Sequence, residues 1–300
     1  MLVAAFTWTE FAQQVAAGIR QGAVFAGLAL ALVIIYRSTR AINFAQGEMA
    51  TFTTFICWSL MNNGLSFWAA FPIVLAIAFV GGIAIERTII RPVENGPVIT
   101  IVIVTLGLAL LLNGLMSVIW GGGSRPFQGP FSTRTIDVGG VPISVQDIGI
   151  VVTSLVLVAI LALYFRYTKL GLALRGAAAN PDSSRLVGVR VGWMLALGWG
   201  IAAVLGAVAG MMIAPVVFLD PNMMQTILLY AFAAAVLGGL DSPLGAVVGG
   251  ILLGVTITLL GRYVGFIGST LKLPAALLLI LVLLLVRPGG LFGKVAVRRV

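Results

Sequence analysis

The chain of 300 residues contains no histidine and only one cysteine, Cys57. The missing histidine excludes a histidine proton relay, a histidine-ligated metal and a Ser-His-Asp triad. A single cysteine cannot form an intrachain disulfide. These absences remove the commonest catalytic and metal-binding constellations, so we expect no catalytic residue, no metal site and no cofactor bound by this chain.

Charged residues are also scarce. They make up 9% of the chain, whereas 60% is hydrophobic and the mean hydropathy is +1.14. Soluble domains carry roughly 25% charged residues. A surface this apolar is stable only in lipid, where spanning segments must satisfy their backbone groups internally. The composition therefore predicts an all-α, polytopic transmembrane helix bundle, with residues 1–300 as a single transmembrane domain in contact with membrane lipid.

Apolar runs near the length of about 20 residues that a spanning helix needs recur along the chain. They predict eight or nine segments, of which the seventh and eighth either span or form a re-entrant hairpin: Phe11–Tyr36, Ala41–Met61, Leu65–Ile85, Val98–Trp120, Ile148–Phe165, Trp193–Phe218, Gln225–Leu240, Leu244–Leu260 and Leu273–Val286.

The net charge is +9. We interpret this excess of Lys and Arg as basic cytoplasmic loops rather than as a nucleic-acid-binding surface, because Lys and Arg gather on the cytoplasmic side of membrane proteins. One set of loops holds 13 basic residues: Arg37, Arg40, Arg87, Arg91, Arg166, Lys169, Arg175, Arg185, Arg190, Arg287, Lys294, Arg298 and Arg299. The other holds 5: Arg20, Arg125, Arg134, Arg262 and Lys272. The N-terminus is therefore predicted outside and the C-terminus inside.

Two loops are long. The loop at 121–147 is predicted to be external, and its VGGVPIS run predicts a strand pair or an ordered turn. The loop at 166–192 is predicted to be cytoplasmic and contains a helix-start signal. Asn180 is a good N-cap, Pro181 suits the first helical position and Asp182 favours the helix N-terminus. The predicted helix covers Pro181–Val187, including Ser183, Arg185 and Leu186, and ends at Gly188.

Polar residues interrupt two apolar segments. Asn43, Gln46, Gly47 and Glu48 lie together, which is tolerated only where a helix faces protein or a water-filled path. They indicate a translocation path or gate, or else Glu48 pairs with Arg40 or Arg87. Gly239 and Asp241 lie in a Gly/Pro-interrupted stretch that suggests a broken helix of the same path, or a plain cytoplasmic turn in which Asp241 or Ser242 caps the next helix.

Glycine spacing also predicts packing. Gly206 and Gly210, like Gly245 and Gly249, have the Gly-xxx-Gly spacing that lets helix backbones approach closely. No GxxxxGK[ST] run occurs, so any ATP that drives this protein binds another chain.

The motifs INFAQGEM at 42–49, GLALRGAAANPDSSRLVGV at 171–189, GGLDSPLGAVVGG at 238–250 and LLVRPGGLFG at 284–293 occur in an order and spacing that resemble one family. It comprises the permease subunits of bacterial branched-chain amino acid ABC importers. Gln46 stands where many relatives have His, Gly176 stands where Ala is common, and LDSPLG departs from a more usual LGSxxG turn. None of these changes removes a group tied to chemistry.

The resemblance implies a multi-pass protein of the bacterial cytoplasmic membrane that works with a second homologous permease, two ATPase subunits and an external substrate-binding protein. It also implies that residues 171–189 carry the coupling helix. Related permeases for amides or urea, and a self-sufficient secondary transporter or channel, remain alternatives. Few intramembrane acids, namely Glu48 and Asp241, weigh against ion coupling.

Overall fold

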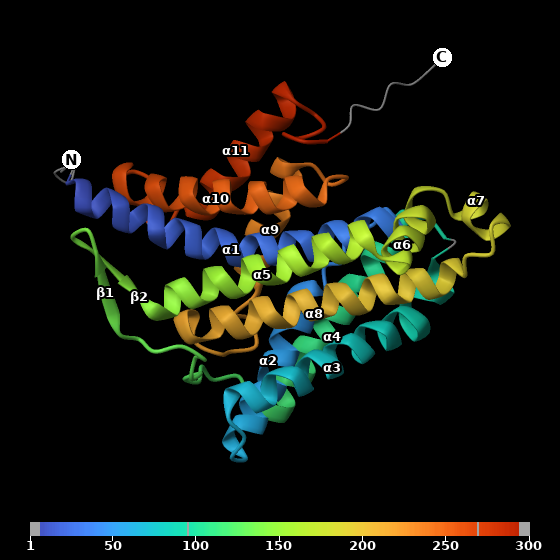
Figure 1. Cartoon of the computed structure of the whole chain (residues 1–300), viewed down its shortest axis with the longest axis horizontal. Coiled ribbons are helices and arrows are strands. Elements are labelled where there is room, and N and C mark those ends of the chain that lie inside the picture. The colour runs from blue at the N-terminus through green and yellow to red at the C-terminus, as the bar shows by residue number, and fades with distance from the viewer. Residues whose placement is uncertain (1–6, 95, 269, 294–300) are drawn as a thin grey trace. The chain divides into compact units, whose positions relative to one another are not determined.

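The structure is a computed structural model that describes residues 7–94, 96–268 and 270–293. Lys294, Arg298 and Arg299, which contributed to the predicted charge asymmetry, lie outside the described residues. The regular elements of the described chain are helices, apart from one β-hairpin (Figure 1). Its elements are α1 (Trp8–Thr39), α2 (Gln46–Asn62), α3 (Phe67–Ile85), η1 (Glu86–Ile90), η2 (Arg91–Val93), α4 (Val98–Trp120), β1 (Thr135–Val138), β2 (Val141–Ser144), α5 (Val145–Tyr167), α6 (Lys169–Ala179), α7 (Pro181–Leu186), α8 (Val191–Val217), α9 (Gln225–Gly238), α10 (Pro243–Tyr263) and α11 (Lys272–Val286).

Six helical stretches in the described residues are long and apolar enough to cross a membrane. They are α1, the stretch Phe67–Val93 that begins with α3, α4, α5, α8 and α10, whereas α9 and α11 are shorter apolar helices. An all-α polytopic bundle is thereby confirmed. α2 begins at Gln46, inside the predicted span Ala41–Met61. α1 ends at Thr39, and Arg40 follows it with a φ of 56°.

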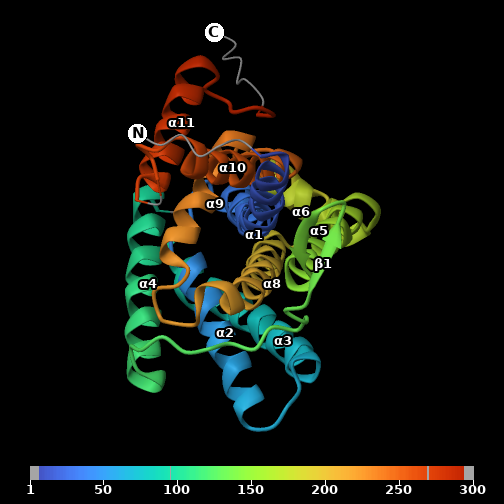
Figure 2. The same ribbon diagram turned by 90° about the vertical axis from the view of Figure 1, so that its left-hand side faces the viewer.

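The chain divides into two compact units. Unit 1 contains Met1–Val33, Phe131–Leu155 and Leu229–Val300, and unit 2 contains Ile34–Pro130 and Val156–Leu228. In unit 1, α1 and α10 pack backbone to backbone at glycines (Figure 2). A Cβ on Gly22 would lie 2.7 Å from the Ile251 Cα, and one on Gly250 would lie 2.5 Å from the Ala26 nitrogen. Such small-residue contacts drive helix association in lipid.

Unit 2 is built around α8, which packs against α2 and α3. The glycine pair predicted to pack lies at this interface. A Cβ on Gly206 would lie 2.6 Å from the Gln46 Nε2, and one on Gly210 would lie 2.8 Å from the Ala50 carbonyl oxygen. The second predicted pair packs within unit 1, where Gly245 and Gly249 contact the end of α9. Both packing predictions are confirmed.

The predicted strand pair is present as β1 and β2, which pair antiparallel with Val138 opposite Val141. Gly139 and Gly140 form the turn with φ values of 63° and 85°. Two positive φ angles are the requirement of a type I′ turn, which explains the glycine pair at this point.

α9 and α10 form a helical hairpin whose turn receives the C-terminal segment of the described chain. Ser242 caps α10 by accepting a hydrogen bond from the Gly245 nitrogen at 3.0 Å. The Leu291 and Phe292 nitrogens donate to the carbonyls of Leu237 and Gly238 at 2.9 and 3.1 Å. Those carbonyls are among the last of α9 and have no partner within the helix. The RPGGLFG segment therefore satisfies the end of α9.

Candidate functional site

The first candidate site is the buried polar segment that leads into α2 in unit 2. Asn43 shapes it, because its Oδ1 accepts a hydrogen bond from the Ala45 nitrogen at 3.0 Å while its Nδ2 donates to the Gln46 Oε1 at 3.2 Å. Asn43 and Gln46 are both fully buried. Buried amides of this kind need partners, and here the segment supplies them locally.

Gln46 also connects this segment to α8. Its Nε2 donates to the Ala202 carbonyl at 2.8 Å. Gly206 lies one helical turn after Ala202, and its lack of a side chain leaves the space that the Gln46 amide occupies. Gln46 therefore acts as a hydrogen-bonding spacer between α2 and α8, a role that needs no titrating side chain.

Glu48 and Gly47 follow in the first turn of α2. Glu48 is 6% exposed, and among the described residues it forms no ion pair. Of the two partners considered from the sequence, Arg87 instead contacts Glu86 at 3.8 Å and stacks on the Trp193 ring at 3.8 Å. Gly47 lies against the Met224 carbonyl, at 3.4 Å from an added Cβ. Glu48 is thus a buried acid in the first turn of a helix that contacts the segment at Met224.

Gly239 and Asp241 belong to unit 1, at the turn between α9 and α10. Gly239 has a φ of 103°, and a Cβ there would lie 2.7 Å from the Gly293 nitrogen. Asp241 is exposed, and Ser242 rather than Asp241 caps α10. The six residues assigned from the sequence to a path therefore fall into two groups of different character: a buried group that begins α2 and a turn that binds the C-terminal segment.

The second candidate site is α7, and its predicted caps are confirmed. The Asn180 Oδ1 accepts a hydrogen bond from the Ser183 nitrogen at 3.0 Å, and Pro181 occupies the first turn. The helix ends at Leu186, one residue before the predicted end, and Gly188 follows with a φ of 82°. The Val189 nitrogen donates to the Ser184 carbonyl at 3.0 Å, which completes a Schellman-type end.

α7 presents an apolar tip to its surroundings. Leu186 is 89% exposed and Val187 is 79% exposed, whereas Ser184 is buried against Gly176 of α6. Arg185 and Asp182 pair at 3.1 Å on the exposed side. The helix is therefore held from one side by α6 and displays two large aliphatic side chains on the other.

α6, which was not predicted from the sequence, precedes α7 in the same loop. Its start signal is Thr168, whose hydroxyl accepts a hydrogen bond from the Gly171 nitrogen at 2.9 Å. A cavity of about 440 Å³ lies beside this segment and is lined by Ala173, Gly188, Val189, Arg190, Trp193, Met194 and Leu197. Thr168 and the amphipathic spacing of Leu170 and Leu174 are the signals that could have located α6.

Comparison with known proteins places these features in a family. The family model described as "Branched-chain amino acid transport system / permease component" matches residues 14–287. The chain belongs to this permease family. The match includes α2, the loop with α6 and α7, and the α9–α10 turn.

Individual relatives agree with the family assignment over nearly the full length. The permease is 29% identical to the high-affinity branched-chain amino acid transport system permease protein LivH of Salmonella typhimurium, over 97% of this chain and 98% of LivH. It is also 29% identical to the corresponding protein BraD of Pseudomonas aeruginosa, with the same coverage. The fructose import permease protein FruF of Bifidobacterium longum is 24% identical over 76% of this chain and 60% of FruF.

Proposed function

We propose that this permease forms the translocation path for branched-chain or related amino acids in an ABC importer. The observation that carries the proposal is the family match over residues 14–287, supported by two relatives whose names state this transport. The energy would come from two separate ATPase subunits, the substrate from an external binding protein, and the other half of the path from a second homologous permease. This chain itself would bind no cofactor.

The exposed tip of α7 supports the docking of an ATPase subunit at this helix. Large aliphatic side chains that stay exposed outside the membrane segments mark contact sites for partner proteins. Leu186 would enter the groove and Arg185 would contact its polar rim. Asn180, Pro181, Asp182, Ser183 and Gly188 would hold the helix in shape.

The proposed topology has the N-terminus outside, the C-terminus in the cytoplasm and eight or nine membrane segments in a bacterial cytoplasmic membrane. The loop at 121–147 would be external and the loop at 166–192 cytoplasmic. Within unit 2, the Arg125 and Leu219 backbones pair beyond the C-terminal end of α8, while α7 precedes its N-terminal end. These points are separated by a helix of 27 residues, about 40 Å long. A separation of that length supports opposite sides of the bilayer.

The proposed path includes Asn43, Gln46, Gly47 and Glu48 in unit 2 and Gly239 and Asp241 in unit 1. Support for the first group is the burial of Glu48, since an acid within a membrane segment is costly and marks functional sites. Asn43 and Gln46 would act by holding α2 in place, because their amides are already bonded to protein groups.

Reconstitution tests the proposal. Liposomes that contain the permease pair, its ATPase subunits and its binding protein should accumulate leucine only when ATP is supplied on the ATPase side. The chain alone should neither hydrolyse ATP nor accumulate leucine when a proton or sodium gradient is imposed. Gradient-driven uptake by the chain alone would identify a secondary transporter instead.

A further inference from the structure

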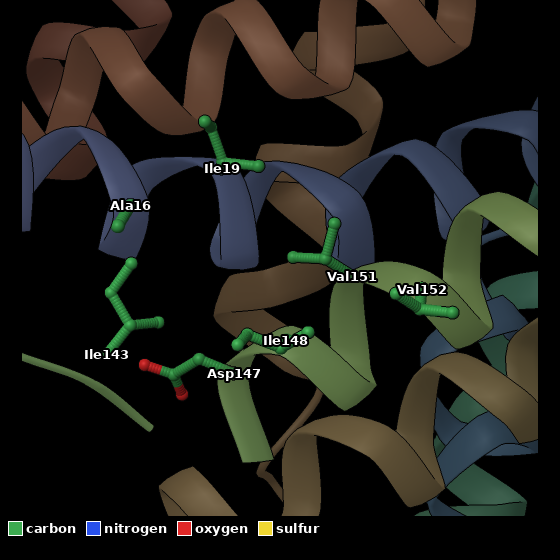
Figure 3. A pocket seen from close by; sticks show the side chains of 7 residues that line it. All are labelled: Ala16, Ile19, Ile143, Asp147, Ile148, Val151 and Val152. Atoms are coloured by element: carbon green, nitrogen blue, oxygen red, sulfur yellow. The ribbon is translucent and has the colours of Figure 1, made fainter. Parts of the chain in front are cut away.

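A small aliphatic cavity in unit 1 has an acid at its edge. It has a volume of about 190 Å³ and is lined by Ala16, Ile19, Ile143, Asp147, Ile148, Val151 and Val152. Figure 3 shows that these residues come from α1, from β2 and from the first two turns of α5, with the Asp147 carboxylate beside Ile143. Pockets for drug-sized ligands measure roughly 300–1,000 Å³. This cavity therefore suits a smaller, mainly aliphatic molecule.

The acid belongs to an ion pair. The Arg20 Nη1 donates to the Asp147 Oδ1 at 2.7 Å, and the two side chains are 19% and 24% exposed. The Arg20 Nε is buried and has no hydrogen-bond partner among the described residues. A guanidinium offers five N–H donors and a carboxylate has two oxygens. The pair thus has zero net charge, and both side chains can form further hydrogen bonds.

The position of Arg20 along α1 indicates the depth of the cavity. Between Arg20 and Thr39, the last residue of α1, lie nineteen helical steps. At about 1.5 Å per residue these steps cover roughly 28 Å, close to the thickness of about 30 Å of a hydrocarbon core. If Thr39 lies at the inner boundary, Arg20 and the cavity lie at the outer boundary, the level at which an imported molecule first meets the proposed path.

We propose that this cavity binds a branched-chain amino acid as a zwitterion. The α-ammonium group would pair with Asp147, the α-carboxylate with Arg20, and the branched side chain would occupy the aliphatic cavity. A neutral ion pair that receives a net-neutral zwitterion adds no uncompensated charge to the partly buried pair. A lipid acyl chain would use the aliphatic wall but neither charge. The inference rests on the proposed function and names a substrate site within it.

Equilibrium binding of radiolabelled leucine to the detergent-solubilised permease tests the site. Val151→Trp fills the cavity from α5, and Ala16→Leu fills it from α1. Both should weaken leucine binding roughly tenfold or more, because the aliphatic side chain loses its space. Leu155→Trp is the matched control, since Leu155 lies one turn further along α5, is exposed and does not line the cavity. It should bind leucine like the wild type.

The charges are tested with two truncated analogues: isocaproate, which lacks the ammonium group, and isoamylamine, which lacks the carboxylate. Wild type should bind both more weakly than leucine. Asp147→Asn should weaken leucine binding roughly tenfold or more, because the leucine ammonium group loses its anionic partner. Isocaproate binding should stay equal or become tighter, because isocaproate has no ammonium group and Arg20 loses its competing carboxylate. A structural role of the ion pair alone would affect both ligands equally.

The site is overturned if the wild type binds no leucine, if the two cavity-filling variants bind it normally, or if Asp147→Asn affects leucine and isocaproate alike. Normal leucine binding by the cavity-filling variants would indicate that lipid acyl chains, and not leucine, occupy the cavity. ATP-driven leucine uptake by the wild-type importer is measured separately. If uptake is normal but the binding measurements contradict the site, only this inference is rejected. If the wild-type importer shows no ATP-driven leucine uptake, the proposed function is rejected.

Discussion

At the scale of single residues, glycine decides how closely these helices approach. Gly210 of α8 lies against α2, where an added Cβ would come within 2.5 Å of the Thr54 Oγ1 and 2.8 Å of the Ala50 carbonyl oxygen. Gly210→Ala should therefore lower the free energy of unfolding by about 1–3 kcal/mol, the usual cost of overpacking. Unfolding midpoints of the purified protein in detergent measure the change.

The matched control for that substitution is Gly107 in α4, where an added Cβ meets nothing within 4 Å. Gly107→Ala should be neutral or raise the stability by roughly 0.5–1 kcal/mol, because alanine restricts the unfolded chain. Equal effects of the two substitutions would mean that the close approach of α2 and α8 does not limit the side chain at Gly210.

At the scale of elements, two residues of the α7 region are proposed to have different roles: Asn180 caps the helix and Leu186 contacts the partner. Leu186→Asp should abolish assembly with the ATPase subunits or ATP-coupled uptake, because an unpaired charge buried in the partner's groove costs several kcal/mol. Membrane insertion should survive, since Leu186 is exposed in the isolated permease. Co-purification with the ATPase and uptake in liposomes measure both effects.

Asn180→Ala serves as the comparison within the same element. It removes the side chain that accepts the Ser183 hydrogen bond, a loss of about 1 kcal/mol of helix stability, and should reduce assembly only mildly. If Asn180→Ala were the more damaging substitution, the partner would recognise the capped helix start rather than the Leu186 tip. If Leu186→Asp assembled normally, α7 would be a connector only.

At the scale of the whole molecule, the two long loops should face opposite sides of the membrane. Ser124 and Ala179 are exposed residues of these loops, and both belong to unit 2. In a Cys57→Ala background, Ser124→Cys should react with a membrane-impermeant thiol reagent added to intact cells, and Ala179→Cys should react only after lysis. Labelling of both from the same side would contradict the proposed orientation.

Features that depend on near neighbours along the chain could be predicted from the amino-acid sequence alone. The membrane class follows from composition, because lipid is the only solvent that tolerates so apolar a surface. The start of α7 follows from Asn180 and Pro181, which act on backbone groups within three residues. The hairpin follows from the Gly139–Gly140 pair, because glycine adopts the two positive φ angles of its turn without steric cost.

Contacts between groups that are distant in the sequence could not be predicted before the helices were seen packed together. Arg20 pairs with Asp147, 127 residues away, and Gln46 bonds to Ala202, 156 residues away. The Leu291 nitrogen donates a hydrogen bond to a carbonyl of α9. Arg40 follows the end of α1 with a positive φ that the local sequence did not predict. Residue type and spacing show that a buried polar group needs a partner, but many partners satisfy that need. Only the packing of helices remote in sequence selects one of them.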